Sequence, residues 1–87
     1  MSEDRLKRLL YRSIYTGTKE LDLVLGGFAR AHLAGLDAGQ LDRFEALVDR
    51  DDPAMYQWII GQEPPPPEFA NDVLGLIQDH ALRMGLR

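Results

Sequence analysis

The chain has 87 residues, no cysteine and a formal net charge of −4, and hydrophobic residues make up 45% of it. This length indicates one domain with a thin core, and the lack of cysteine excludes a disulfide scaffold and thiol-based zinc, iron–sulfur or redox chemistry. A sequence pI near 5.0 argues against nucleic acid as a partner, because binding phosphates requires a surplus of Lys and Arg.

The sequence indicates neither a secretory signal nor a membrane span. In residues 1–15 the longest wholly apolar run is Leu9–Leu10, whereas a signal peptide needs an unbroken apolar region. No stretch approaches the roughly 20 apolar residues of a membrane-spanning helix. We therefore expect a cytoplasmic domain that does not insert into a membrane.

Helical periodicity predicts five amphipathic helices, at approximately residues 3–15, 18–34, 38–50, 53–60 and 67–84. No segment shows sustained alternation of apolar and polar residues, so we expect an all-α fold without a sheet. The prediction is a compact five-helix bundle that forms a single domain over residues 1–87. The predicted core-facing positions are Leu6, Leu9, Leu10, Ile14, Leu21, Val24, Leu25, Phe28, Ala31, His32, Leu41, Phe44, Leu47, Val48, Met55, Trp58, Ile59, Phe69, Val73, Leu76, Ile77, His80 and Met84.

Local signals predict several of the helix boundaries. Gly35 is expected to end the second helix in a left-handed conformation. Asp37 and Gln40 form the pattern of a capping box that opens the third helix. Asp52 before Pro53 predicts the N-cap and first position of the fourth helix.

Charge is unevenly distributed along the chain. Residues 1–20 contain five basic and three acidic residues, a net charge of +2, whereas the rest contains five basic and eleven acidic residues, a net charge of −6. On a helix Arg5, Arg8 and Arg12 share one face, since they are three and four residues apart. This face is either a solvated helix surface or a docking patch for an acidic partner.

Patterns for catalysis and metal binding are poorly represented. His32 and His80 lie on or beside apolar stripes, and although they can meet across a bundle, two histidines without paired carboxylates are a weak metal signal. Gly26–Gly27 falls within a predicted helix, so we interpret it as a close approach of another backbone or a weak point, and not as a phosphate-binding loop. We predict no catalytic residue, no metal site and no enzymatic activity.

The segment of residues 15–22 is the hardest to explain by structure alone. If Gly17 is an N-cap, Glu20 stands at the third helical position and its carboxylate can reach back to a cap amide. Alternatively, Gly17 brings the backbone close to a partner while Glu20 presents a carboxylate beside it.

Four stretches, taken in this order and spacing, resemble the succinate dehydrogenase assembly factor family, also called the FAD assembly factor or SdhE family. They are residues 8–13, 17–25, 41–48 and 51–59. The resemblance implies a five-helix factor that binds the flavoprotein subunit of succinate dehydrogenase or of fumarate reductase. It implies that the factor is not an enzyme and promotes covalent attachment of FAD to a histidine of that subunit. We expect a bacterial monomer that binds no cofactor tightly itself.

The signature of this family is Arg-Gly-x-x-Glu at the junction of the first two helices. Gly17 and Glu20 match it, whereas Thr16 stands at the arginine position and offers one hydroxyl in place of a fixed fork of donors. The chain is then a divergent member with normal activity, a member in which Arg12 or Lys19 supplies the cation, or a weakened version. The expected partner-binding residues are Gly17, Glu20, Thr16, Arg8, Arg12, Tyr11 and Asp22.

Aromatic residues near the motif are further candidates for partner contacts. Tyr11 and Tyr15 fit an interface and a structural role equally well, whereas Phe28 and Trp58 are expected in the core. Two rival functions remain open: a generic helical adaptor without a flavin role, and a small enzyme that attaches flavin by itself.

Overall fold

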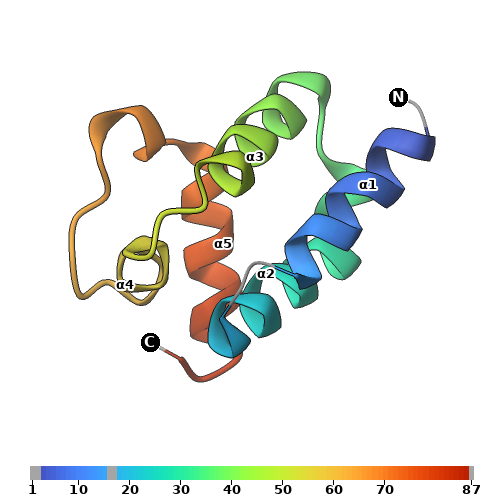
Figure 1. Ribbon diagram of the computed structural model, residues 1–87. Helices are drawn as coiled ribbons and strands as arrows, with labels where there is room; N and C mark the ends of the chain where they lie inside the picture. Colours follow the sequence, from blue (N-terminus) through green and yellow to red (C-terminus); the bar gives the residue numbers. More distant parts are fainter. Residues whose placement is uncertain (1–2, 16–17, 87) are drawn as a thin grey trace.

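The computed structural model describes residues 3–15 and 18–86, and this part of the chain contains helices and no β-strand. Its five α-helices are α1 (Glu3–Ile14), α2 (Lys19–His32), α3 (Ala38–Arg50), α4 (Met55–Ile60) and α5 (Asp72–Arg83). Two short 3₁₀ helices, η1 (Leu33–Gly35) and η2 (Pro67–Phe69), lie between them (Figure 1). The predicted all-α, single-domain fold with five helices is confirmed.

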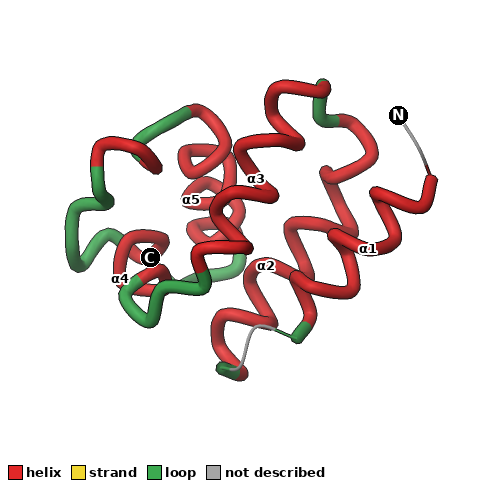
Figure 2. The backbone as a smooth tube through the Cα atoms, turned by 45° about the horizontal axis from the view of Figure 1, so that its top comes forward, coloured by secondary structure: helices red, strands yellow, loops and turns green. Residues whose placement is uncertain are grey.

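Helices α2 and α5 connect the others. Helix α2 packs against α1, α4 and α5, and α5 packs against α2, α3 and α4. Helices α1 and α4 lie on opposite sides of α5 in both Figure 1 and Figure 2, and α3 contacts both α1 and α5. Each amphipathic helix therefore covers the apolar face of at least two others.

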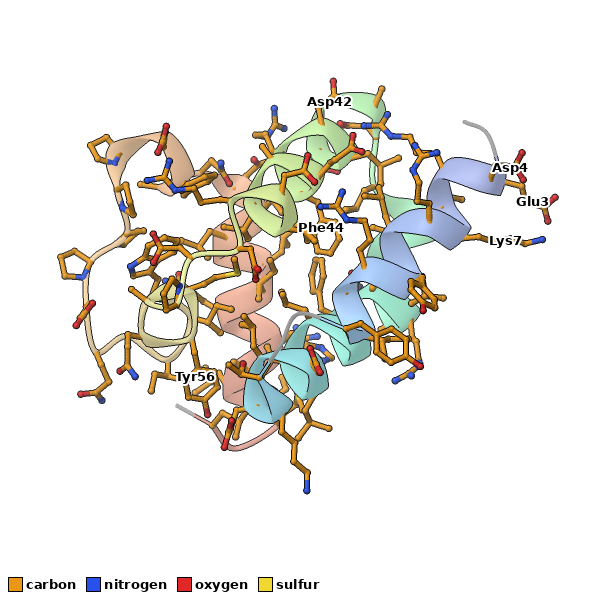
Figure 3. The ribbon with its side chains drawn as sticks, in the orientation of Figure 1. Glu3, Asp4, Lys7, Asp42, Phe44 and Tyr56 are labelled. Atoms are coloured by element: carbon orange, nitrogen blue, oxygen red, sulfur yellow. The ribbon has the colours of Figure 1, made fainter. Side chains whose placement is uncertain are left out.

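Two phenylalanine rings occupy the centre of the bundle. Phe28 of α2 and Phe44 of α3 are fully buried, and their ring centroids are 5.8 Å apart in a stacked arrangement. Figure 3 shows Phe44 pointing from α3 toward the interior. A second stacked pair, Trp58 with Phe69, lies on the α4 side with centroids 5.8 Å apart. Phe28 and Trp58 are therefore core residues, as predicted.

The predicted core is wrong at the end of the second helix, where Ala31 and His32 are exposed, and at two positions of the last helix. Leu76 and Met84 are exposed by 39% and 37%, although they continue the apolar stripe of α5. Leu76 lines a surface depression, and Met84 follows the last helical residue as the C-cap. A chain this short cannot cover every side of its last helix.

Gly26 and Gly27 allow two helices to approach α2 closely. A Cβ atom added at Gly26 would lie 3.2 Å from Cγ1 of Ile14 on α1. A Cβ atom added at Gly27 would lie 3.0 Å from Nε2 of His80 on α5. Both distances are shorter than most real Cβ contacts, so the glycine pair is a site of close packing. The expected approach of another backbone is found only at Gly26, where Cα of Ile14 would lie 3.9 Å from the added Cβ atom, while Gly27 faces the His80 side chain.

The beginning of α3 forms the predicted capping box. The Asp37 carboxylate accepts a hydrogen bond from the Gln40 backbone N–H at 2.8 Å, and Gln40 Oε1 accepts one from the Asp37 N–H at 3.1 Å. These bonds satisfy donors at the helix start that have no partner within the helix.

The predicted boundaries around α2 and α4 are wrong in detail. Gly35 does not adopt a left-handed conformation, because α2 tightens into η1 and the chain leaves it through extended Leu36. Asp52 does not cap α4 directly. Its carboxylate accepts a hydrogen bond from the Ala54 N–H at 2.8 Å, which forms a turn, and α4 begins at Met55.

The fifth helix begins at Asp72 and not at residue 67 as predicted. Pro67–Phe69 forms a separate 3₁₀ turn, and Ala70 leaves the helical conformation before α5 starts. The side chain of Asn71 then accepts a hydrogen bond from the Leu74 N–H at 3.1 Å and caps α5. An N-cap side chain therefore sets this boundary, and the preceding apolar residue Phe69 belongs to the core without belonging to the helix.

Replacement of the capping side chain tests how much the α3 boundary stabilises the fold. We expect Asp37→Ala to lower the free energy of unfolding by about 1 kcal/mol, because N-cap donors lose their acceptor. Asp79→Ala is the control, since Asp79 is exposed within α5 and caps no helix. Urea unfolding followed by circular dichroism measures both variants. Equal midpoints for the two would show that the capping box contributes no measurable stability.

Candidate functional site

The junction between α1 and α2 is the site that the sequence points to. Thr16 and Gly17 lie outside the described residues. The N-cap of α2 is Thr18, which is extended with φ −122° and ψ 142° and makes no side-chain cap bond. Glu20 is therefore the second residue of the helix and not the third, as it would be in the alternative with an N-cap at position 17.

Glu20 is exposed in the first turn of α2, where the helix dipole stabilises a carboxylate. Within the described part of the chain it forms no ion pair. Asp22, in the same turn, is half-buried, and its N–H donates to the Thr18 carbonyl at 3.0 Å. Of these two candidates, Glu20 is the more exposed residue.

The arginine stripe of α1 is divided between two environments. Arg5 donates to Asp42 at 2.6 Å and to Glu45 at 3.0 Å, and the hydrogen bond to Asp42 is the main cause of a raised pKa for the Arg5 guanidinium. Arg12 forms an ion pair with Asp49. Arg5 and Arg12 thus connect α1 to α3.

Arg8 differs from its two neighbours on α1. It is exposed, and no acidic residue in the described ranges pairs with it. Tyr11 and Tyr15 lie three and seven residues further on, are exposed by 65% and 66%, and have ring centroids 4.6 Å apart. We call these three residues the Arg8–Tyr11–Tyr15 face. Exposed aromatic rings beside an unpaired arginine are typical of protein–protein contact surfaces.

The sequence pattern missed two features of this region. Asp42, Glu45 and Asp49 on α3 have the same three- and four-residue spacing as the α1 arginines, a signal that could have predicted their ion pairs. Leu23 is 61% exposed and follows Glu20 by one helical turn. It lies outside the apolar stripe of α2, so its position on the surface was readable from the sequence.

A small depression lies beside the junction. Its volume is about 210 Å³, and it is lined by Arg12, Tyr15, Val48, Asp49 and Asp51. Asp51 has a left-handed backbone with φ 48° and ends α3 here. The depression is polar and shallow, so it extends the surface around Tyr15 without forming an enclosed active site.

The two histidines meet on another side of the molecule. The rings of His32 and His80, which were expected to be able to meet across the bundle, have centroids 5.9 Å apart. Burial, followed by the positive charges of His32 and Arg83, lowers the pKa of His80 below its usual value. Among the described residues, no group of three or more His, Cys, Asp or Glu side chains is arranged to hold a metal ion.

No helix within residues 3–15 and 18–86 is long and apolar enough to cross a membrane.

The described part of the chain belongs to the class of small all-α domains, with exposed aromatic and charged side chains beside one helix junction. The particular family follows from comparison with known proteins. A family model described as "Flavinator of succinate dehydrogenase" matches residues 7–81, and the chain belongs to this family. The resemblance predicted from the four sequence stretches is confirmed.

Several curated relatives cover most of this chain. The mitochondrial succinate dehydrogenase assembly factor 2 of Dictyostelium discoideum is 39% identical over 74 residues, which are 85% of this chain and 52% of that protein. The FAD assembly factor SdhE of Acetobacter pasteurianus is 33% identical over 82 residues, which are 93% of this chain and 75% of that protein. The chain spans about half the length of the mitochondrial relatives. No solved structure matches the chain. The names describe assembly factors and not catalysts, in agreement with the expectation that this chain is no enzyme.

The lowered pKa of His80 predicts a pH dependence of stability. The unfolded chain binds a proton at this histidine more readily than the folded chain does. The contribution of His80 to the free energy of unfolding is therefore present above about pH 6.5 and is lost as the pH drops below that value. We expect the urea midpoint of the wild type to decrease between about pH 7.5 and pH 5, a window above the titration of most carboxylates. The His80→Gln variant should show a flatter curve. Parallel curves for the two proteins would contradict the assignment to His80.

Proposed function

We propose that this chain is an assembly factor that binds the flavoprotein subunit of succinate dehydrogenase, of fumarate reductase or of both, and promotes covalent attachment of FAD to it. The match of residues 7–81 to the flavinator family is the observation that carries this proposal. FAD is attached to the partner, and the factor holds no cofactor tightly. The expected setting is the bacterial cytoplasm, with the factor present as a monomer.

The factor would act by selecting one conformation of its partner. A protein that binds the attachment-competent conformation more tightly than the others shifts the population toward it, by a factor of ten for about 1.4 kcal/mol of differential binding. The chemistry then proceeds within the flavoprotein's own site. This role requires a binding surface and no catalytic group on the factor, which is consistent with the described surface around Glu20.

The partner contact is proposed to centre on Gly17 and Glu20 and to extend over the Arg8–Tyr11–Tyr15 face. Because Thr16 stands at the family's arginine position, the positive charge at this site would have to come from a neighbouring basic residue. Arg12 is already paired with Asp49. Lys19 is exposed next to Glu20 and, within the described residues, forms no ion pair. Lys19 is therefore the better candidate for the missing positive charge.

The most direct test is covalent-flavin fluorescence of the partner subunit in a denaturing gel. Apo-flavoprotein and FAD are incubated with and without this protein, and we expect faster flavin attachment in its presence. A complex that forms in a pull-down without any change in attachment would favour a generic helical adaptor. Attachment to a minimal acceptor peptide would favour a self-sufficient flavin-attaching enzyme.

Glu20→Ala is expected to weaken flavoprotein binding and slow flavin attachment without unfolding the bundle. Glu20 is exposed and, within the described residues, forms no ion pair, so its removal leaves the packing unchanged. Glu63→Ala is the matched control, because Glu63 is also exposed but lies after α4, in the chain between α4 and η2. Titration against apo-flavoprotein measures both affinities. If Glu20→Ala and Glu63→Ala bind equally well, Glu20 is not a site residue.

Thr16→Arg is expected to strengthen the complex. An arginine supplies a planar fork of donors to a carboxylate or a flavin oxygen, whereas threonine supplies one hydroxyl. The same titration measures the gain, and Thr18→Arg adds an equal charge two residues away as the control. An affinity that rises equally in both variants would indicate general electrostatic attraction, and an unchanged affinity would show that the arginine position is dispensable here.

A further inference from the structure

A second depression lies between the end of α2, η1, the start of α3 and α5. Its volume is about 330 Å³, which exceeds the 210 Å³ of the depression beside Arg12. The residues that give it its chemical character are Phe28, His32, Leu36, Leu76, His80 and Arg83. None of these residues belongs to the Arg8–Tyr11–Tyr15 face or to the α1–α2 junction.

The two imidazole rings in this depression are held in place by a buried ring. Phe28 is fully buried, and its centroid lies 5.2 Å from that of His32 and 6.0 Å from that of His80. The planes of the two imidazoles are nearly perpendicular, at 88°. Gly27 provides the space that His80 needs to approach α2. Phe28 and half-buried His80 thus form the floor of the depression, and the exposed side chains of His32, Leu76 and Arg83 form its rim.

Basic groups converge here without an acidic partner. His32, His80 and Arg83 each form no ion pair within the described part of the chain, and their mutual repulsion contributes to the lowered pKa of His80. Asp79 also lines the depression but forms no ion pair with them. A bound anion would offset this repulsion and favour protonation of the imidazole.

The rest of the lining is apolar. The ring of Phe28 and the side chains of Leu36 and Leu76 contribute to the walls. The exposure of Leu76, which the sequence pattern did not predict, occurs at this depression. A ligand that fits would place an apolar body against these side chains and an anionic group near the histidines, which is the usual composition of a small-molecule site.

We propose that this depression binds a carboxylate carried on a small apolar body. The imidazoles and Arg83 would hold the carboxylate, and Phe28, Leu36 and Leu76 would contact the body. The site is separate from the surface proposed to bind the flavoprotein, so the proposal stands or falls independently of the flavin role.

Nuclear magnetic resonance titrations with defined probes test the chemistry. Benzoate carries both features, acetate has the carboxylate alone, and benzyl alcohol has the ring alone. We expect benzoate to shift the signals of His32, His80 and Leu76 at lower concentration than either partial probe. A blocked peptide with a glutamate side chain distinguishes the two possible sources of the carboxylate. Tighter binding of benzoate indicates that the ligand is a free small acid, and tighter binding of the peptide indicates that it is an acidic side chain of a protein. Absence of saturable shifts with all four probes would overturn the proposal.

Arg83→Gln and Arg30→Gln form a matched pair of variants. Both remove one exposed arginine, but Arg30 lies away from the depression, beside Lys7 and Leu33. We expect Arg83→Gln to weaken benzoate binding severalfold and Arg30→Gln to leave it unchanged. Equal loss in both variants would identify unspecific attraction to positive charge and would overturn the proposal.

The pH dependence of benzoate binding provides a second measurement. The charged or titratable groups that face His80 are His32 from α2 and Asp79 and Arg83 from α5, while α3 contributes the uncharged Gln40. We expect binding at about pH 5.5 to be severalfold tighter than at about pH 8, because a bound carboxylate beside His80 favours the protonated imidazole and raises the pKa of His80. The dependence should be weaker in His80→Gln. Affinity that does not change with pH in the wild type would exclude the imidazoles from the site.

Discussion

The structure depends on the packing around one segment of α2, where α1 and α5 approach closely and a ring of α3 reaches in. Gly26 contacts α1, Gly27 contacts α5 and Phe28 stacks on Phe44 of α3. Successive residues of an α-helix point about 100° apart, so three neighbouring residues reach three different partners. The two glycines lower the intrinsic helix propensity of α2 by about 1 kcal/mol each relative to alanine. Tertiary packing offsets this loss, which is how a chain with a thin core holds five helices together.

This packing also determines what α1 presents to its surroundings. On one side α1 lies against Gly26, and on the other side Arg5 and Arg12 are tied to acidic residues of α3. Arg8 and Tyr11 are then left on the outer side of the helix. Figure 3 shows Lys7 pointing away from the bundle as well. The proposed binding surface thus rests on a helix that is fixed on two sides, and ordered contact residues lose less entropy when a partner binds.

Local chemistry made much of the fold predictable. The capping box joins Asp37 and Gln40, which are only three residues apart, so the sequence alone predicts it. The stripes of apolar residues likewise predict which side of each helix is buried. Features that depend on a second element were not predictable in the same way. The ion pairs of Arg5 and Arg12 require that α3 lies beside α1. The matching spacing of acidic residues on α3 is a signal for them, but it becomes visible only when the two helices are compared. The start of α5 was misplaced because Phe69 is buried like a helix residue but belongs to a 3₁₀ turn.

Contacts with a second helix also change how much positive charge is available near the α1–α2 junction. From the sequence, residues 1–20 carry a net charge of +2, which suggests a basic patch for an acidic partner. In the fold, Arg5 and Arg12 are neutralised by α3, so the positive charge available to a partner is smaller than this figure indicates. Lys19 next to Glu20 provides a flexible point charge in place of an arginine fork. In such a surface the exposed rings of Tyr11 and Tyr15 and the side chain of Leu23 must contribute a larger share of any binding energy, because burial of apolar area does not depend on the missing cation.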